Sequence, residues 1–300
     1  MSRAVIRPAR VEDAPDVVAL RTLVFPYLVR GVASTRRMIA EPPPGEDWQA
    51  WVAEADGRVV GWVSAYRNTQ TSTPGVGEIA TLHVHPAHRR RGIGATLLDT
   101  ALDHVRALGS TRVLGHARAE SLPFARRHGF TPSRELRYST LDLRPAPPMP
   151  EPPPGVRLLP AAGLDPRRIH RVDAESARDE PGDVPVDALD YDLWRHECWE
   201  NLGLDREAST VAEVDGELAA LSLVKRDGDR MWSDYTGTLP AYRGRGLGRL
   251  TKQAALHRAA ARGVRTAYTS NDEANAPMLA INARLGYRPV DSQWSCRRTL

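Results

Sequence analysis

The stretch AHRRRGIGATLL at residues 87–98 returns in altered form as AYRGRGLGRLTK at residues 241–252. Both copies join arginines to two glycines that are spaced by one residue, and a helix-forming segment follows the glycines. A β-rich segment that ends at Pro86 or Pro240 precedes each copy. This order predicts a strand, a tight turn and the first turn of a helix, twice in one chain.

The two copies belong to a longer repeat. Three other segments match in the same order: VIRPA with VRLLPA, WVAEADGRVVGWVSA with TVAEVDGELAALSLV, and FARRHGF with INARLGY. Matched positions lie 154 residues apart at Arg89 and Arg243, and 157 residues apart at Gly129 and Gly286. Such a near-constant offset between ordered segments predicts the duplication of one domain.

A proline-rich stretch, RPAPPMPEPPPG at residues 144–155, separates the two copies. Proline cannot continue a helix interior or a central strand, so this stretch predicts a semi-rigid linker. We therefore expect an N-terminal domain over residues 1–145, a linker over 146–155 and a C-terminal domain over 156–300.

Both halves show the same predicted elements. An Asp-Gly pair joins two β-rich runs at residues 56–57 and again at 215–216, which is typical of a β-hairpin. A third strand, the helix of the repeated stretch, another strand and a short helix follow, and a last strand is expected to close each half at 134–143 and 292–299. The predicted fold class is α+β, mixed and three-layered: two tandem domains, each a largely antiparallel twisted sheet flanked by helices.

The composition excludes several classes of protein. Hydrophobic residues make up 41% of the 300 residues, which suffices for globular cores, and no apolar run has the length of a membrane span. Two cysteines, Cys198 and Cys296, cannot build a disulfide framework or a four-cysteine zinc site. The N-terminal MSRAVIRPARVED lacks the apolar segment of a secretory signal, so we expect a cytoplasmic protein with no membrane partner.

The charge is uneven along the chain. The formal net charge is +4, with +6 on residues 1–150 and −2 on residues 151–300. A basic half indicates either a phosphate-bearing partner or a solvated arginine-rich surface. His83, His85 and His88 form a string that could suggest a metal, but we expect no metal site.

The repeated stretch has the features of an anion site. Glycine has no Cβ, so another group can approach the backbone closely. The first amides of a helix lack intrahelical acceptors and lie at the positive end of the helix dipole, which suits phosphate. The glycine pattern differs from that of a dinucleotide-binding βαβ unit, and the Gly-Lys-Ser/Thr of a P-loop is absent.

In this setting each half resembles a GNAT-family N-acetyltransferase domain, whose acetyl-CoA motif is Arg/Gln-x-x-Gly-x-Gly/Ala. The motif stands here as Arg89–Gly94 and Arg243–Gly248, and the resemblance spans nearly the whole chain outside the linker. It implies that acetyl-CoA is the co-substrate, that the motif amides bind its pyrophosphate, and that the preceding strand pairs with its pantetheine. The positions implied in this binding are Leu82, His83, Val84, Arg89, Arg90, Arg91, Gly92, Ile93, Gly94, Ala95, Thr238, Leu239, Arg243, Gly244, Arg245, Gly246, Leu247, Gly248, Arg249, Asn271, Asn275 and Asn282.

The family's later motif distinguishes the two halves. In the second half Asn275 matches the family's pantetheine-binding Asn, and Asn282 stands where the family commonly has a Tyr as general acid. The first half has Arg118 and Ala125 at these two positions. We therefore expect a catalytic C-terminal domain and an N-terminal domain that binds CoA or is degenerate.

Direct acetyl transfer needs a neutral amine, a stabilised oxyanion and a protonated leaving thiolate. A carboxylate can accept the proton of the amine, and Asp234 and Glu78 are the candidate bases. Tyr235 is a candidate acid, and the amide of Asn282 can hydrogen-bond the thiolate. Each candidate also has a structural interpretation, as a solvent-facing strand carboxylate or as a buried tyrosine.

The acceptor region of the second half is acidic. Residues 164–207 contain 13 Asp and Glu against 6 Arg, whereas residues 12–47 contain 6 against 4. An acidic entrance would concentrate a cationic substrate. The leading hypothesis is an acetyl-CoA-dependent N-acetyltransferase that acts by direct attack in a ternary complex on a primary, cationic amine. That amine belongs to a small molecule or peptide, and homodimerisation stays open.

Three other functions are alternatives to this N-acetyltransferase. An acyltransferase similar to mycothiol synthase would also be a tandem protein, although the missing Tyr before Gly286 weakens that match. A CoA-binding sensor or scaffold would bind without turnover. A nucleic-acid binder would use Arg89–Arg91 and show steeply salt-dependent affinity, but we expect no nucleic-acid partner.

Overall fold

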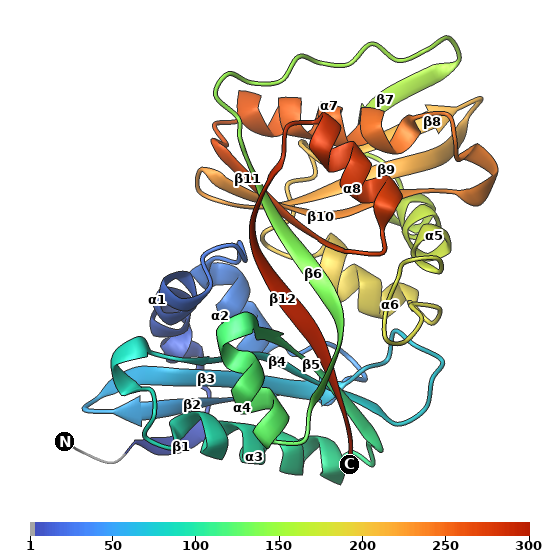
Figure 1. Ribbon diagram of the computed structural model, residues 1–300. Helices are drawn as coiled ribbons and strands as arrows, with labels where there is room; N and C mark the ends of the chain where they lie inside the picture. The colour runs from blue at the N-terminus through green and yellow to red at the C-terminus, as the bar shows by residue number, and fades with distance from the viewer. Residues whose placement is uncertain (1–3) are drawn as a thin grey trace. The chain divides into compact units, whose positions relative to one another are not determined.

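The chain forms two compact units, and the computed structural model describes residues 4–300 (Figure 1). The N-terminal unit contains the residues up to Leu136 together with Ser292–Leu300. The C-terminal unit contains Arg137–Asp291. Within the described residues, none of the helices combines the length and the apolar character that a membrane crossing requires.

The N-terminal unit contains a sheet in the order β1-β2-β3-β4-β5-β12, in which neighbouring strands are antiparallel except for the parallel pair β4–β5. Its strands are β1 Val5–Pro8, β2 Gln49–Ala55, β3 Arg58–Arg67, β4 Val76–Val84, β5 Arg112–Arg118 and the end of β12 Arg288–Thr299. Its helices are α1 Ala14–Val24, α2 Val32–Ala40, α3 Ile93–Ala107 and α4 Leu122–Arg127.

The C-terminal unit repeats this plan in the order β6-β11-β10-β9-β8-β7, with β10–β11 as the parallel pair. Its strands are the end of β6 Thr131–Asp142, β7 Val156–Pro160, β8 Thr210–Val214, β9 Glu217–Asp227, β10 Arg230–Thr238 and β11 Thr266–Asp272. Its helices are α5 Pro166–Ala177, α6 Tyr191–Trp194, α7 Leu247–Ala261 and α8 Ala276–Arg284, and a π-helical turn over Arg195–Trp199 follows α6.

Buried side chains alternate between the two faces of the sheet along a strand, so each face carries its own hydrophobic core. In β2, Val52 packs with Val17 of α1, whereas the next residue, Ala53, packs with Leu97 of α3. Successive strand side chains point to opposite faces, so one strand serves both cores. Each unit therefore has a helix–sheet–helix arrangement, which confirms the predicted three-layer α+β fold.

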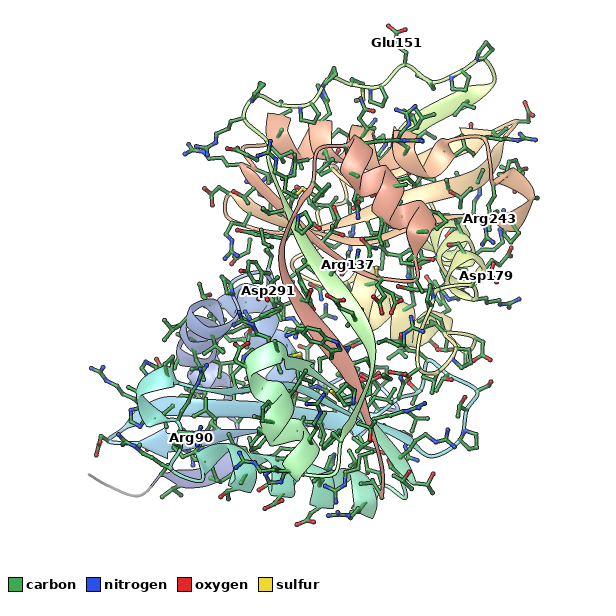
Figure 2. All side chains as sticks on the ribbon, viewed as in Figure 1. Arg90, Arg137, Glu151, Asp179, Arg243 and Asp291 are labelled. Carbon is green, nitrogen blue, oxygen red and sulfur yellow. The ribbon has the colours of Figure 1, made fainter. Side chains whose placement is uncertain are left out.

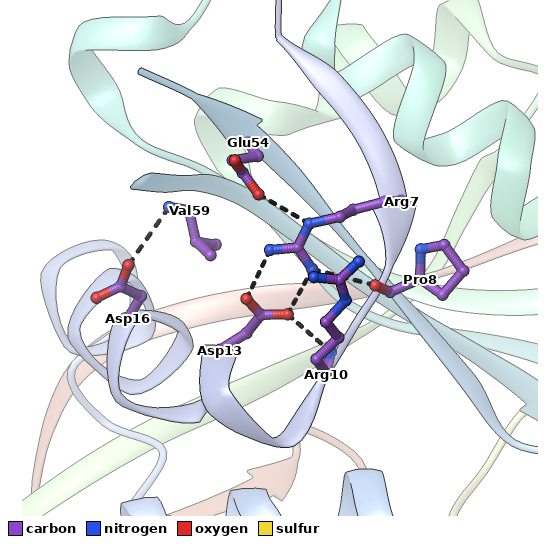
Figure 3. A network of polar contacts seen from close by, with 7 residues as sticks. All are labelled: Arg7, Pro8, Arg10, Asp13, Asp16, Glu54 and Val59. Atoms are coloured by element: carbon purple, nitrogen blue, oxygen red, sulfur yellow. Dashed lines mark hydrogen bonds and ion pairs between the residues drawn. The ribbon is translucent and has the colours of Figure 1, made fainter. Parts of the chain in front are cut away.

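A hydrogen-bonded cluster around Arg7 ties the first strand to the helical layer (Figure 3). The Arg7 guanidinium donates to both carboxylate oxygens of Asp13, at 2.7 and 2.8 Å, and to Glu54 on β2 at 2.8 Å. Burial acts to raise the pKa of Asp13, but the hydrogen bonds from Arg7 and from the Arg10 amide outweigh it and lower that pKa. This cluster holds the start of α1 against the sheet edge.

The two parallel pairs diverge along their length. Strands β10 and β11 pair from Arg230 with Thr266 to Trp232 with Tyr268, and no later pair joins them among the described residues. The residues of β10 from Ser233 onward therefore present an unpaired edge toward β11. This divergence leaves room for the cleft described below.

The last strand of each half joins the sheet of the other half. Strand β12 pairs with β5, from Gln293 opposite Arg118 to Thr299 opposite Arg112. Strand β6 lies beside β11, where the Leu143 amide donates to the Arg265 carbonyl at 2.8 Å. The prediction that 134–143 and 292–299 each close their own half is therefore wrong. Both strands carry the same local pattern, and the choice of edge is not encoded in that pattern.

The proline-rich stretch does not separate the two compact units. It connects β6 to β7, which both lie in the C-terminal unit, and it lies along α7. Gln253 and His257 of α7 form hydrogen bonds with the carbonyls of Pro148 and Pro147, at 3.1 and 2.9 Å. The units consequently differ from the boundaries predicted at residues 145 and 156. Chain composition shows where a helix or strand must stop, but it does not show which sheet the next strand joins.

Candidate active site

Helix α7 begins at a backbone cradle of glycines. Gly246 is its N-cap with φ of 75°, and the Leu250 amide is the first to find a helical acceptor, the Gly246 carbonyl at 3.1 Å. The amides before Leu250 in the first turn have no acceptor within the helix. A Cβ added at Gly244 or Gly246 would meet no atom within 4 Å, so there is room above the helix start for a bound group.

Arg243 fixes this turn to its surroundings. Its Nε donates to the Thr238 carbonyl at 3.2 Å, and its Nη1 lies 2.6 Å from Asp179, just past α5 (Figure 2). The first arginine of the motif therefore holds the strand end and the helix start in one geometry. Its side chain is itself still partly exposed to an incoming anion.

A cleft of about 640 Å³ opens between β10, β11, α7, α8 and the segment after α5. It contains the cradle at one end and acidic side chains at another. Of the residues predicted to bind or act, those that line it are Asp234, Tyr235, Thr238, Arg243, Gly244, Gly246, Leu247, Gly248, Arg249, Asn271 and Asn275. The lining lacks the predicted Leu239, Arg245 and Asn282. The lining lies wholly within the C-terminal unit.

Asp234 lies at an irregularity of β10. The register with β9 shifts between Ser233 and Tyr235, so Asp234 is the inserted residue of a β-bulge. Bulges re-aim side chains, and this one places the carboxylate in the cleft wall. Asp234 Oδ2 lies 2.8 Å from the Nζ of Lys225 on β9, so its charge is already paired in this structure.

Tyr235 faces α5 rather than open solvent. Its hydroxyl donates to the Ser176 Oγ of α5 at 3.1 Å. Burial raises the pKa of Tyr235 far above its ordinary value, and the nearby Asp173 adds to that effect. Tyr235 therefore joins β10 to α5, and a phenol that holds its proton so tightly is a poor proton donor at neutral pH.

Asn282 does not reach the cleft. It is 4% exposed, and its Nδ2 donates to the Asn271 Oδ1 at 2.5 Å. Asn275, in contrast, lines the cleft while its Oδ1 caps α8 by accepting from the Met278 amide at 3.2 Å. The prediction that Asn282 contacts the leaving thiolate finds no support in this position.

Two buried titratable side chains escaped the sequence analysis. Lys252 of α7 lines the cleft at 2% exposure, and burial lowers its pKa to about 7. Burial likewise raises the pKa of Asp173 to about 7, although the Trp194 indole donates to its Oδ2 at 2.7 Å. Alignment of the two copies could have marked Lys252, since Leu98 stands at the same place in the first stretch.

The N-terminal unit has the same turn but a different interior. Arg89 Nε donates to the Val84 carbonyl at 3.2 Å, and Gly92 caps α3 with φ of 82°. Five polar positions of the C-terminal unit are replaced here by members of one apolar core. They are Ser233, Lys252, Asn271, Asn282 and Tyr287, and their counterparts are Ile79, Leu98, Ala117, Ala125 and Phe130.

Glu78 and His83, which were predicted to act or bind in the N-terminal unit, form hydrogen bonds and packing contacts within the fold. Glu78 accepts hydrogen bonds from the Tyr66 hydroxyl at 2.7 Å and from Asn68 at 2.6 Å. His83 is buried beside Phe25, and burial lowers its pKa to about 4. Within residues 4–300 no three His, Cys, Asp or Glu side chains gather as a group that could hold a metal.

Comparison of the chain with known proteins identifies the family to which it belongs. The model of the acetyltransferase (GNAT) family matches residues 20–130 and 169–287. The chain belongs to the GNAT family. The matched ranges contain both arginine–glycine stretches, so this GNAT protein is an acyltransferase with two tandem GNAT domains.

Two relatives of this GNAT protein are 33% and 30% identical to it over the aligned part of the chain. A mycothiol acetyltransferase of Amycolatopsis mediterranei (strain U-32) is 33% identical over 249 residues, which cover 79% of each chain. A mycothiol acetyltransferase of Nocardioides sp. (strain ATCC BAA-499 / JS614) is 30% identical over 243 residues, which cover 72% of this chain and 78% of the relative.

Solved structures share the fold of this GNAT protein. A tandem GNAT protein from the clavulanic acid biosynthesis pathway has a TM-score of 0.77 at 22% identity, covering 99% of this chain and 98% of the other. A GCN5-related N-acetyltransferase from Sphaerobacter thermophilus has a TM-score of 0.73 at 20% identity, covering 100% and 96%. At these identities the likeness concerns the fold.

Proposed function

We propose that the C-terminal unit binds acetyl-CoA in its cleft and transfers the acetyl group directly to a primary amine. The observation that carries this proposal is one continuous cleft with the glycine cradle of α7 at one end and Asp234 and Glu180 elsewhere in its lining. The cleft offers both a phosphate site and an acceptor site within one unit.

The cradle fits the anionic end of acetyl-CoA. The free amides at the start of α7 and the side chains of Arg243 and Arg249 provide donors and positive charge for a pyrophosphate. The edge of β10 beyond Ser233 is unpaired toward β11, so it can hydrogen-bond the amides of a pantetheine chain. Bound there, acetyl-CoA would supply the activated acetyl group.

The remaining lining favours a cationic acceptor. Asp179, Glu180 and Asp234 line the cleft near α5, and acidic walls raise the local concentration of a cation. An amine that displaces Lys225 from Asp234 would find a carboxylate able to take its proton. Asp234 is therefore the base that we assign to this reaction.

The N-terminal unit is proposed as a degenerate copy. Its motif retains the turn of Arg89 and Gly92, but apolar core residues such as Leu98 and Ile79 occupy the positions that form the polar cleft in the other unit. Such a unit can stabilise the fold, whereas the chemistry belongs to the C-terminal unit.

A turnover assay with a panel of amines tests this proposal. Release of free CoA thiol is followed with polyamines, aminoglycosides and basic peptides, and with an acidic amino acid for comparison. Asp234→Asn is expected to lower kcat/KM for the cationic acceptors about 100-fold, because the carboxylate that accepts the proton of the amine is lost.

Asp215→Asn, in the exposed turn between β8 and β9, is the matched control and should keep full activity. Turnover confined to anionic amino acids, or an Asp234→Asn enzyme as active as the control, would contradict the proposed acceptor.

The relatives' name supports a second candidate acceptor. Both relatives are called mycothiol acetyltransferase, and each aligns with more than two thirds of this chain. The same assay with the mycothiol precursor amine distinguishes the candidates, because the preferred acceptor will show the highest kcat/KM. Either outcome keeps the acetyl transfer in the same cleft.

A further inference from the structure

Lys252 places a buried ammonium group in the wall of the cleft. It lies six residues after Gly246 on α7, about 9 Å along the helix axis from the cradle. Its Nζ lies 5.1 Å from the centre of the Tyr287 ring, and the Tyr287 hydroxyl shares a hydrogen bond of 2.9 Å with Ser233. Ser233 is the first residue of β10 past its last pair with β11, so Lys252 lies where the strands diverge.

This ammonium has no hydrogen-bond partner among the described residues. Its Nζ contacts the face of the Tyr287 ring, and within residues 4–300 no carboxylate pairs with it. A buried charge without a partner costs stability, so its retention calls for a use. Because Lys252 lines the cleft, the partner it lacks can be a group of the bound substrate.

The matching position of the N-terminal unit shows that the fold does not need a lysine here. Leu98 lies six residues after Gly92, as Lys252 lies six after Gly246, and Leu98 is a buried member of the apolar core. An apolar side chain therefore satisfies the packing at this place. The lysine accompanies the polar cleft and not the helix.

The two positions predicted from the sequence to assist the leaving thiolate do not supply a proton donor. Asn282 stands at the family's common acid position, is buried, and is bonded to Asn271. The pKa of Tyr235 is raised too far for it to give up a proton at neutral pH, and its hydroxyl already donates a hydrogen bond to Ser176. Lys252 is a cleft side chain whose protons form no hydrogen bond with a protein acceptor among the described residues.

We propose that Lys252 is the acid that protonates the departing thiolate of coenzyme A. This inference rests on the proposed acetyl transfer. As the amine nitrogen bonds to the acetyl carbon, the C–S bond breaks with its electron pair on sulfur. Lys252 Nζ gives a proton to that sulfur and becomes a neutral amine. The acceptor nitrogen loses its proton to Asp234, and both side chains regain their starting states by exchange with solvent.

The environment of Lys252 suits this role at neutral pH. Burial lowers its pKa to about 7, so the protonated and neutral forms are close in free energy, as an efficient acid requires. Tyr287 presents its ring to Lys252, and among the described residues no charged side chain contributes to the shift of the Lys252 pKa. The acid is protonated below about pH 7, so kcat should fall as pH rises above that value.

Two variants separate proton donation from charge. Lys252→Met removes the proton and the charge, and it should fold because Leu98 is accommodated at the matching place. Lys252→Arg keeps a charge that does not titrate below pH 12, so it cannot donate. We expect both variants to lose about 100-fold in kcat, to bind acetyl-CoA with a Kd within threefold of the parent, and to lose the alkaline fall of kcat.

Calorimetric titration with acetyl-CoA, circular dichroism and the pH profile of kcat are measured on all three proteins. Activity at the parental level in Lys252→Arg would overturn the proposal, because a positive charge alone would then suffice. Loss of acetyl-CoA binding in Lys252→Met would also overturn it, because Lys252 would then serve to bind acetyl-CoA. A Lys252→Met enzyme with parental kcat would also overturn it. If Lys252→Met does not fold, the pH profiles of the other two proteins test the proposal. It requires that kcat falls above about pH 7 in the parent and does not fall there in Lys252→Arg. Failure of the parent itself to bind acetyl-CoA would instead contradict the proposed function.

Discussion

Asp173 shows how a single residue of the acceptor region is tuned by burial. It lies on the buried side of α5 and accepts a hydrogen bond from the Trp194 indole at 2.7 Å. Burial raises its pKa to about 7, and the nearby charge of Asp234 adds to the rise. At neutral pH this carboxyl is therefore close to half protonated, and its charge responds to the state of the cleft.

The pKa of Asp173 predicts a pH-dependent change in stability. The folded pKa is about 7 and the ordinary value is 3.8, so the carboxyl destabilises the fold fully above pH 7 and hardly at all below pH 4. Asp173→Asn should therefore raise the free energy of unfolding by about 1–3 kcal/mol at pH 8, with much less gain at pH 4.5. Urea unfolding at the two pH values measures the difference, and a larger gain at pH 4.5 would contradict the assignment.

The residues of the motif could be predicted from the sequence, and the buried titratable groups could not. A glycine with positive φ at a helix start leaves a local signature, and Gly246 and Gly92 both lie where that signature placed them. The roles of Asp173 and Lys252 depend on burial, which arises from side chains distant in the sequence. Asn282 shows the reverse error, because its motif position was right but its side chain is turned toward Asn271.

At the scale of elements, α3 and α7 begin with the same turn, but α3 packs against an apolar core whereas α7 lines the cleft. Both begin at a left-handed glycine that follows an arginine bonded to the end of the preceding strand. The helices and strands were predictable to within a few residues, because hydrophobic period and turn residues are local. The edge that each last strand joins was not predictable, because both closing strands fit either edge.

The exchange of the last strands predicts a specific disulfide. His116 on β5 and Ser295 on β12 are Cα partners in the antiparallel pair, a spacing that suits a disulfide. His116→Cys with Ser295→Cys should form an intramolecular disulfide on mild oxidation, which peptide mapping by mass spectrometry identifies. The matched control is Ser270→Cys with Ser295→Cys, because Ser270 occupies in β11 the place of His116 in β5. A disulfide in the control and none in the first variant would show that β12 closes its own half.

At the scale of the whole molecule, one of the two tandem GNAT domains has kept a polar cleft. The interior of the C-terminal unit presents Ser233, Lys252 and Asn271 where the N-terminal unit packs apolar residues into its core. The duplication was evident from the repeated segments. The proposed difference in function between the copies rests on positions scattered along the sequence, which the fold brings together.

Stoichiometric titration with acetyl-CoA tests most directly whether the C-terminal unit alone holds the site. We expect one site per chain, which is lost in Gly246→Val with Gly248→Val and kept in the matched Gly92→Val with Gly94→Val. Circular dichroism checks that each variant folds. Two sites per chain, or binding that survives the first pair of substitutions and is lost in the second, would contradict this expectation.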